Sequence, residues 1–140
     1  MWTCPQCGQQ FVYQNQWHSC GNTVEGFLEE RSQQAIGLYH YFMETYRALC
    51  DFQVHPVKTR VSLLIKMRFA SVNRLGKGFL DGHLVLREPY RETLCFHNVE
   101  MISKNQHVHH FRLHSKEDIT GELKRYMKKA CRETGTRLDL

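Results

Sequence analysis

The sequence predicts an α+β fold in which helices pack on one face of an antiparallel sheet, preceded by a small metal-stabilised unit. Two segments, residues 32–51 and 115–135, carry apolar residues at the helical spacing of three and four. Between them the apolar period falls to two, which is the period of strands. Residues 4–20 place cysteine and histidine at the spacing of a zinc site.

Residues 1–22 are expected to form the zinc-binding unit. Cys4 and Cys7 have the C-x2-C spacing that lets two thiolates reach one metal from a single tight turn. His18 and Cys20 are two positions apart, so both point to the same side of an extended segment. So short a unit cannot build a core of its own and needs a metal to stabilise it. We expect one structural Zn²⁺ bound by Cys4, Cys7, His18 and Cys20, because four protein ligands leave no open position for catalysis.

Two other interpretations of the C-x2-C motif remain open. A redox motif normally lies where a strand meets a helix in a βαβ pattern, and the flanking sequence has no such pattern. A disulfide suits a secreted protein, but the chain does not begin with a signal segment. Cys50, Cys95 and Cys131 also make an awkward count for a disulfide framework. We therefore expect a reducing, cytoplasmic location.

Size and charge are those of one ordinary domain beside the zinc unit. The chain has 140 residues, of which 41% are hydrophobic, and this is enough for a packed core. No stretch reaches the roughly 18 consecutive apolar residues of a membrane span, so no membrane partner is expected. The formal net charge of +5 suits DNA, RNA or another anionic partner. We expect the boundary at Gly21-Asn22, with an α+β domain over residues 23–140.

Two helices are expected to open this domain. Thr23 is a suitable N-cap for a short helical turn over residues 24–29. A longer helix is expected over residues 32–51, and Pro56 ends the helical region. The apolar side chains of the longer helix recur on one face: Ala35, Leu38, Tyr39, Phe42, Met43, Tyr46 and Leu49.

About four strands are expected to follow. Alternating apolar residues predict strands over residues 59–72, 79–87, 94–102 and 107–114. Residues 76–78 and 103–106 are typical of turns. Because the connections are short, we expect an antiparallel meander in which sequence neighbours pair.

A basic amphipathic helix is expected to close the chain. Ser115 to Asp118 resembles a capping box, and Gly135 is a suitable C′ residue. The inner face consists of Ile119, Leu123, Tyr126, Met127 and Ala130, and the outer face of Lys124, Arg125, Lys128, Lys129 and Arg132. Cations near a helix C-terminus are favoured by the macrodipole, so half of this basic run needs no function.

The histidine-rich strand 107–114 is the candidate functional element. His107 and His109 are expected to point toward the helices, whereas His110 and Arg112 point to the opposite face of the sheet. If the strands pair as expected, that opposite face collects six basic side chains: Lys66, Arg68, His83, Arg87, His110 and Arg112.

Three interpretations of this basic face remain open. The first is the solvated face of a one-sided sheet, which is expected to be polar. The second is a binding surface for the phosphates of nucleic acid or of a phosphorylated ligand. Arginine and lysine suit phosphate oxygens, and Phe79, Tyr90 and Phe96 are near enough in sequence to stack on the bases of a single strand.

The third interpretation is a second metal site or a general acid–base centre. It uses His83, His107 or His109 together with Asp81 or Glu100. Two histidines two residues apart on a strand can share a metal. No HExxH motif, paired carboxylates or nucleophile motif accompanies these residues.

Several motifs resemble those of one bacterial family. The run Trp-x-Cys-Pro-x-Cys-Gly-x-x-Phe, followed by Asn-Gln-x-His-Ser-Cys-Gly, spans Trp2 to Gly21. It is similar to an amino-terminal zinc segment found on some members of the family catalogued as domain of unknown function 5655. The motifs at residues 58–60, 67–70 and 107–113 are similar to the same family, so the resemblance covers nearly the whole chain. It implies a small α+β domain, also found appended to longer proteins that include nuclease-related ones, and it implies no activity or catalytic residue.

The expected function is binding of nucleic acid through the basic sheet face and the basic last helix. One alternative is an enzyme that acts on a phosphorylated or nucleic-acid substrate through the histidine-rich strand. Another is a protein-interaction module in which the zinc unit binds a second chain.

Overall fold

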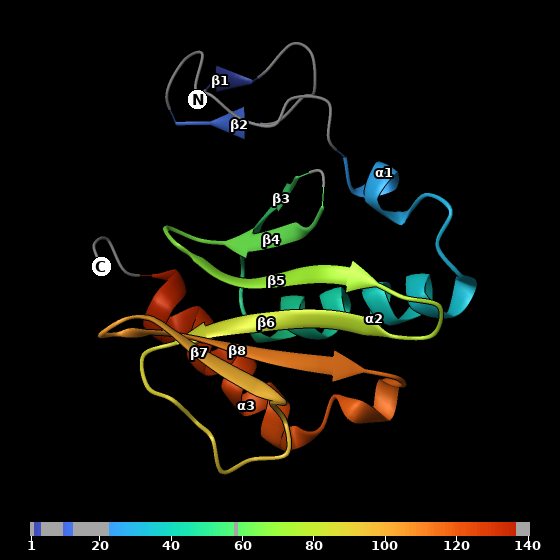
Figure 1. The fold of residues 1–140 in the computed structure, drawn as a ribbon. Helices are drawn as coiled ribbons and strands as arrows, with labels where there is room; N and C mark the ends of the chain where they lie inside the picture. The colour runs from blue at the N-terminus through green and yellow to red at the C-terminus, as the bar shows by residue number, and fades with distance from the viewer. Residues whose placement is uncertain (1, 4–9, 13–22, 58, 137–140) are drawn as a thin grey trace.

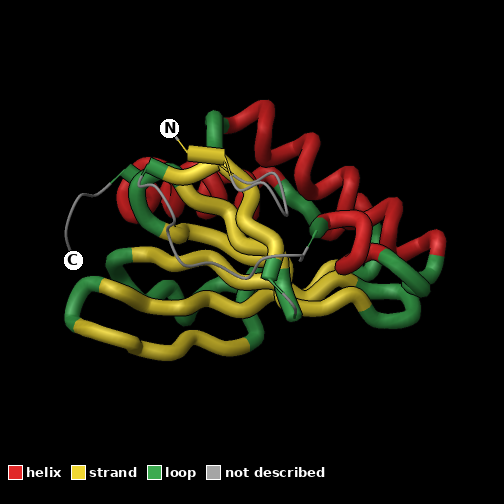
Figure 2. Tube along the Cα trace, turned by 90° about the horizontal axis from the view of Figure 1, so that it is seen from above, coloured by secondary structure: helices red, strands yellow, loops and turns green. Residues whose placement is uncertain are grey.

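A computed structural model describes residues 2–3, 10–12, 23–57 and 59–136. These residues form an α+β fold with a six-stranded antiparallel sheet, so the expected class is confirmed and the expected strand number was too low. The helices α2 and α3 lie on one side of the sheet, as the two views in Figure 1 and Figure 2 show. We call the sheet face that points away from these two helices the outer face.

The two predicted amino-terminal helices are present. In α1, Val24–Leu28, the hydroxyl of the N-cap Thr23 accepts a 2.9 Å hydrogen bond from the Gly26 amide. In α2, Gln33–Leu49, the N-cap is Ser32, and the apolar stripe packs against the sheet. Within the described ranges, no helix is long and apolar enough to cross a membrane.

The six strands of the main sheet follow in the order β3-β4-β5-β6-β8-β7. Their bounds are β3 Gln53–Pro56, β4 Val61–Leu64, β5 Arg68–Leu75, β6 Leu80–Leu86, β7 Asn98–Ser103 and β8 Gln106–Leu113. A separate two-stranded sheet pairs β1, Trp2–Thr3, with β2, Gln10–Phe11.

The single strand predicted over residues 59–72 is wrong, because this segment folds as the β4–β5 hairpin. The chain turns between Leu64 and Arg68, where the Gly135 carbonyl accepts hydrogen bonds from the amides of Lys66 (2.7 Å) and Met67 (3.1 Å). The apolar alternation runs through the turn, so the period alone does not reveal it. The strand β3, which pairs with β4, was not predicted either.

The predicted meander is wrong at one connection. β6 pairs with β8, and β7 lies outside β8 at the edge of the sheet. The segment between β6 and β7 is a long loop, so β7 begins at Asn98 instead of Leu94. The loop is held to the sheet by Tyr90, whose amide donates a 3.0 Å hydrogen bond to His109 Nε2. A connection of this length allows β7 to pass the position that β8 occupies.

The predicted last helix is divided into three parts. The capping box forms, but it belongs to a 3₁₀ turn, Lys116–Asp118. The α-helix α3, Gly121–Ala130, begins three residues later, where the hydroxyl of Thr120 accepts a 3.1 Å hydrogen bond from the Leu123 amide. A π-helical turn, Cys131–Gly135, follows α3. Two separate caps explain why one continuous helix does not form.

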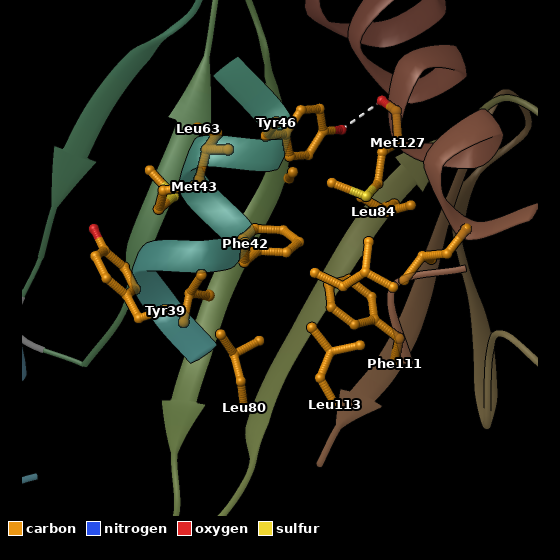
Figure 3. Close-up of a cluster of buried hydrophobic side chains, with 14 of the residues drawn as sticks. Tyr39, Phe42, Met43, Tyr46, Leu63, Leu80, Leu84, Phe111, Leu113 and Met127 are labelled. Carbon is orange, nitrogen blue, oxygen red and sulfur yellow. Dashed lines mark hydrogen bonds between the residues drawn. The ribbon is translucent and has the colours of Figure 1, made fainter. Parts of the chain in front are cut away.

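The core lies between the sheet and the two long helices (Figure 3). The Phe42 ring of α2 lies 5.7 Å from the ring of Phe111 on β8. Tyr46, also on α2, is fully buried, and its hydroxyl donates a 2.5 Å hydrogen bond to the Met127 carbonyl of α3. Burial raises the pKa of Tyr46 well above its ordinary value, so the hydroxyl remains a donor. The two helices are therefore joined through the core as well as through the sheet.

Replacing two glycines by alanine is expected to change stability in opposite directions. A Cβ at Gly82 on β6 would lie 2.7 Å from the Phe111 ring and 2.7 Å from the Ser71 carbonyl oxygen. Gly82→Ala should lower the free energy of unfolding by about 1–3 kcal/mol through overpacking. A Cβ at Gly37 on α2 meets nothing within 4 Å, so Gly37→Ala should raise it by about 0.5–1 kcal/mol through helix propensity. Urea unfolding measures both free energies. A Gly82→Ala protein with the same free energy of unfolding as the wild type would contradict the packing described.

Candidate functional site

Two adjacent rows of side chains cross the whole sheet on opposite faces. The inner row is apolar except for one histidine, and it runs through Val54, Leu63, Ala70, Leu84, His109 and Val99. The residues next to it in sequence form the outer row, which is polar throughout: His55, Ser62, Ser71, His83, His110 and Asn98. We call this second set the polar row. The alternation of side chains along each strand therefore places His109 and His110 in different environments.

His109 is a satisfied core histidine. It is fully buried, and both ring nitrogens are hydrogen-bonded: Nδ1 donates to the His107 carbonyl (2.8 Å), and Nε2 accepts from the Tyr90 amide (3.0 Å). Burial lowers the pKa of His109, so the ring stays neutral in this tautomer. His107 is also buried on the inner face. His109 thus has no free nitrogen to bind a metal. A metal site shared by His107 and His109 is therefore excluded.

His83 and His110 face each other on the outer side of the sheet. They are directly opposite in the β6–β8 pairing, with ring centroids 5.7 Å apart. Asn73 Nδ2 lies 2.9 Å from His83 Nδ1, and Glu100 Oε1 lies 2.6 Å from His110 Nε2. Burial, with smaller effects of His110 and Arg60, lowers the pKa of His83 to about 4. The structure therefore joins two histidines that are far apart in sequence, each held by one polar side chain.

Arg112 lies one step along the same two strands and is already paired. Its Nε and Nη2 donate to both carboxylate oxygens of Asp81 at 2.6 and 2.9 Å. This hydrogen bond raises the pKa of Arg112. The guanidinium also lies 4.1 Å from the ring centroid of Phe79, which has Arg74 at 5.5 Å. Arg112 and Phe79 thus form a compact arginine–aromatic cluster beside the histidine pair.

The other three residues of the expected basic face lie away from this pair. Lys66 is in the turn between β4 and β5, Arg68 begins β5, and Arg87 follows the last residue of β6. All three are exposed at the end of the sheet where the π-helical turn is docked. The six residues Lys66, Arg68, His83, Arg87, His110 and Arg112 therefore occupy two regions, and the structure brings only His83, His110 and Arg112 together.

An open cavity of about 490 Å³ lies beside α3. Its walls are the rings of Tyr90 and Tyr126, whose centroids are 5.0 Å apart, and the charged side chains of α3 and the π-helical turn. These charged residues are Glu122, Arg125, Lys128, Lys129, Arg132 and Glu133. We call this feature the α3 cavity. A smaller hollow of about 290 Å³, which Arg87 and Asn105 also line, shares Tyr90, Lys129 and Glu133 with it, so the two adjoin.

The charges of the α3 cavity are partly compensated. Lys129 Nζ lies 2.9 Å from Glu133 Oε1, and this contact raises the pKa of Lys129. In the described part of the chain, Arg125, Lys128 and Arg132 form no ion pair, so they remain available to an anion. The sequence named Tyr90 as a stacking candidate but placed it near the sheet face. Only the path of the β6–β7 loop brings it to Tyr126, which the helical pattern had assigned to the core.

The expected zinc ligands Cys4, Cys7, His18 and Cys20 lie outside the described residues, as does most of the expected unit over residues 1–22. Among the described residues, no group of three or more histidine, cysteine, aspartate or glutamate side chains could hold a metal ion. No family model matches the chain, and neither a curated protein nor a solved structure matches it significantly. The resemblance to domain of unknown function 5655 stays a prediction.

Lowering the pH is expected to weaken the fold through His83. Its pKa in the folded state, about 4, lies below its ordinary value of 6.5. Between these pH values the unfolded chain binds more protons, so stability rises with pH. The contribution of neutral His83 to the free energy of unfolding is complete above pH 6.5. About 2–3 kcal/mol of it is lost as the pH falls toward 4.

His83→Gln provides the control, because glutamine cannot titrate. As the pH falls from neutral to 4, the free energy of unfolding of the wild type should fall relative to that of His83→Gln, until the two are equal or the variant is the more stable. Urea unfolding at a series of pH values measures the difference. Parallel curves would show that His83 has an ordinary pKa in the folded protein.

Proposed function

We propose that the protein binds single-stranded nucleic acid in the α3 cavity. The observation that carries this proposal is the meeting of two tyrosine rings with three cations that have no ion-pair partner in the described part of the chain. Tyr90 and Tyr126 supply aromatic surface, and Arg125, Lys128 and Arg132 surround it. Single-strand binding combines base–aromatic stacking with a basic path for the phosphates.

Arg87 extends this path along the adjoining hollow. It lies at the end of β6 and shares that hollow with Tyr90, Lys129 and Asn105. Lys66 and Arg68 are exposed at the same end of the sheet and add positive potential there. Three of the six residues expected to bind an anion, Lys66, Arg68 and Arg87, therefore lie at the end of the sheet that adjoins the proposed site.

The outer face is less suited to a polyanion than the sequence indicated. Arg112 is neutralised by the Asp81 carboxylate, and His110 lies against Glu100. His83 is uncharged at neutral pH because its pKa is about 4. A long polyanion would therefore gain little electrostatic attraction at this face. The proposed interface is therefore the α3 cavity, with the outer face outside it.

A single strand is preferred over a duplex because of the shape of the site. Two tyrosine rings at the wall of a cavity can accept unstacked bases, whereas the bases of a duplex are stacked on one another. Affinity should decrease in the order single-stranded RNA or DNA, then duplex.

The double variant Lys128→Gln, Arg132→Gln is expected to weaken this binding and to reduce its salt dependence. Each removed phosphate contact lowers the slope of log K against log salt by about 0.7 for single strands. Fluorescence anisotropy with labelled oligonucleotides over a series of salt concentrations measures the slope. Lys77→Gln, in the exposed turn between β5 and β6, is the matched control, because it lies outside the cavity. Equal slopes for the double variant and the wild type would exclude the α3 cavity as the interface.

We also propose that residues 1–22 bind one structural Zn²⁺ through Cys4, Cys7, His18 and Cys20. The support is the donor set itself, because three thiolates and one imidazole at these spacings suit tetrahedral zinc. The metal would stabilise a segment too short to build a core.

Metal analysis is expected to find one zinc per chain in the wild type and less than one in Cys20→Ser. Loss of one of four ligands leaves an incomplete tetrahedral site with lower affinity. Cys95→Ser is the control, because this half-buried cysteine lies in the α+β domain and should leave the zinc content unchanged. A Cys20→Ser protein with full zinc would refute the ligand set.

A further inference from the structure

Two hydrogen-bonded pairs, which we call dyads, lie on the outer face: His110 with Glu100, and His83 with Asn73. The two histidines are left with complementary hydrogen-bonding groups. A carboxylate only accepts, so Glu100 Oε1 accepts a hydrogen bond from His110 Nε2–H, and the neutral ring keeps a lone pair on Nδ1. An amide nitrogen only donates, so Asn73 Nδ2 donates to His83 Nδ1 and leaves the proton on His83 Nε2. One ring therefore offers a base, and the neighbouring ring, 5.7 Å away, offers a neutral N–H donor.

The surroundings of His83 keep it neutral. Asn73 faces it from β5, His110 from β8, and Arg60 acts on it from the segment before β4. The nearest acidic group on its own strand, Asp81, is bound to Arg112. Burial, with smaller effects of His110 and Arg60, lowers the pKa of His83, so it can donate a hydrogen bond without becoming a cation.

His110 is held as a general base is held in established active sites. The carboxylate fixes its tautomer and supports the positive charge that forms when Nδ1 takes a proton. The side chain of His110 is 25% exposed, so a substrate can reach it. Neither ring is hydrogen-bonded to a hydroxyl or a thiol within the described ranges. The nucleophile must then come from the substrate or from water.

We propose that His110 and His83 act as general base and hydrogen-bond donor in the cleavage of RNA by transesterification. RNA carries its own nucleophile, the 2′-hydroxyl, next to the phosphate that it attacks. The cluster of Arg112 on Phe79, one step along the same strands, offers a surface for an adjacent base. This activity goes beyond the binding function proposed above and does not depend on the α3 cavity.

The reaction balances without a further reactant. His110 Nδ1 removes the proton of the 2′-hydroxyl, and the oxygen forms a bond to phosphorus. His83 Nε2–H donates to a phosphoryl oxygen as negative charge develops there. The bond from phosphorus to the 5′-oxygen breaks, and the leaving alkoxide takes a proton from water. His110 then returns its proton to solvent, and the products are a 2′,3′-cyclic phosphate and a 5′-hydroxyl end.

The test uses a labelled DNA oligonucleotide that contains a single ribonucleotide. The wild-type protein should cleave it at that residue and should leave the all-DNA and 2′-O-methyl versions intact. His110→Ala and His83→Gln should each lower the rate by a hundred-fold or more, the usual range for acid–base and oxyanion groups. His97→Ala is the matched control, since its ring lies 6.2 Å from that of His110 and belongs to neither dyad.

Glu100 is a positioning residue and needs a readout other than the rate alone. Glu100→Gln should lower kcat with little change in KM, because Glu100 orients the His110 ring and does not contact the substrate. Nitrogen NMR of the imidazole rings should place the proton of neutral His83 on Nε2. A proton on Nδ1 of neutral His83 would overturn the assigned roles even if every variant folds.

Absence of cleavage by the wild type, or equal cleavage by a His83→Gln, His110→Ala double variant purified in the same way, would refute the proposal. Cleavage with no binding at the α3 cavity would refute the proposed binding function alone, and binding without cleavage would refute only the activity.

Discussion

Burial of one face of the sheet under α2 and α3 is the constraint on which the rest of the structure depends. The stripe of α2 covers the inner row, and the Tyr46–Met127 hydrogen bond holds α3 beside it. Once the inner row is fixed, each neighbouring residue of the same strand must point outward. The polar row is therefore a consequence of core packing. The α3 cavity arises at the margin of the same arrangement, where the β6–β7 loop reaches α3.

The adjacent residues His109 and His110 show how burial of one sheet face determines which ring nitrogens remain free. His109 uses both nitrogens to hold the loop at Tyr90 and the backbone at His107, so it is structural. His110 uses one nitrogen on Glu100 and keeps the other. The two residues are identical in type, and only the face of the strand distinguishes them. A histidine-rich segment therefore indicates a functional site only after its faces have been assigned.

The sequence was informative wherever a pattern was local. The helical stripe of α2 and the two faces of β8 were predicted correctly, because each depends on spacing within one element. The β4–β5 turn was missed because the apolar alternation continues through it, and its stabilising contact comes from distant Gly135. The β8–β7 order and the meeting of Tyr90 with Tyr126 depend on the loop of residues 87–97. Long-range contacts of this kind leave no periodic signal in the chain.

The distribution of charge differs between the outer face and the α3 cavity. On the outer face, Asp81 and Glu100 compensate Arg112 and His110, and His83 is neutral. Such a face has little net attraction for a polyanion, but it holds rings in fixed tautomers, which proton transfer requires. Beside α3, Lys129 is the one cation with an ion pair among the described residues, so Arg125, Lys128 and Arg132 retain their long-range field there. The six basic residues expected on one sheet face therefore lie in two regions that differ in how far their charges are compensated.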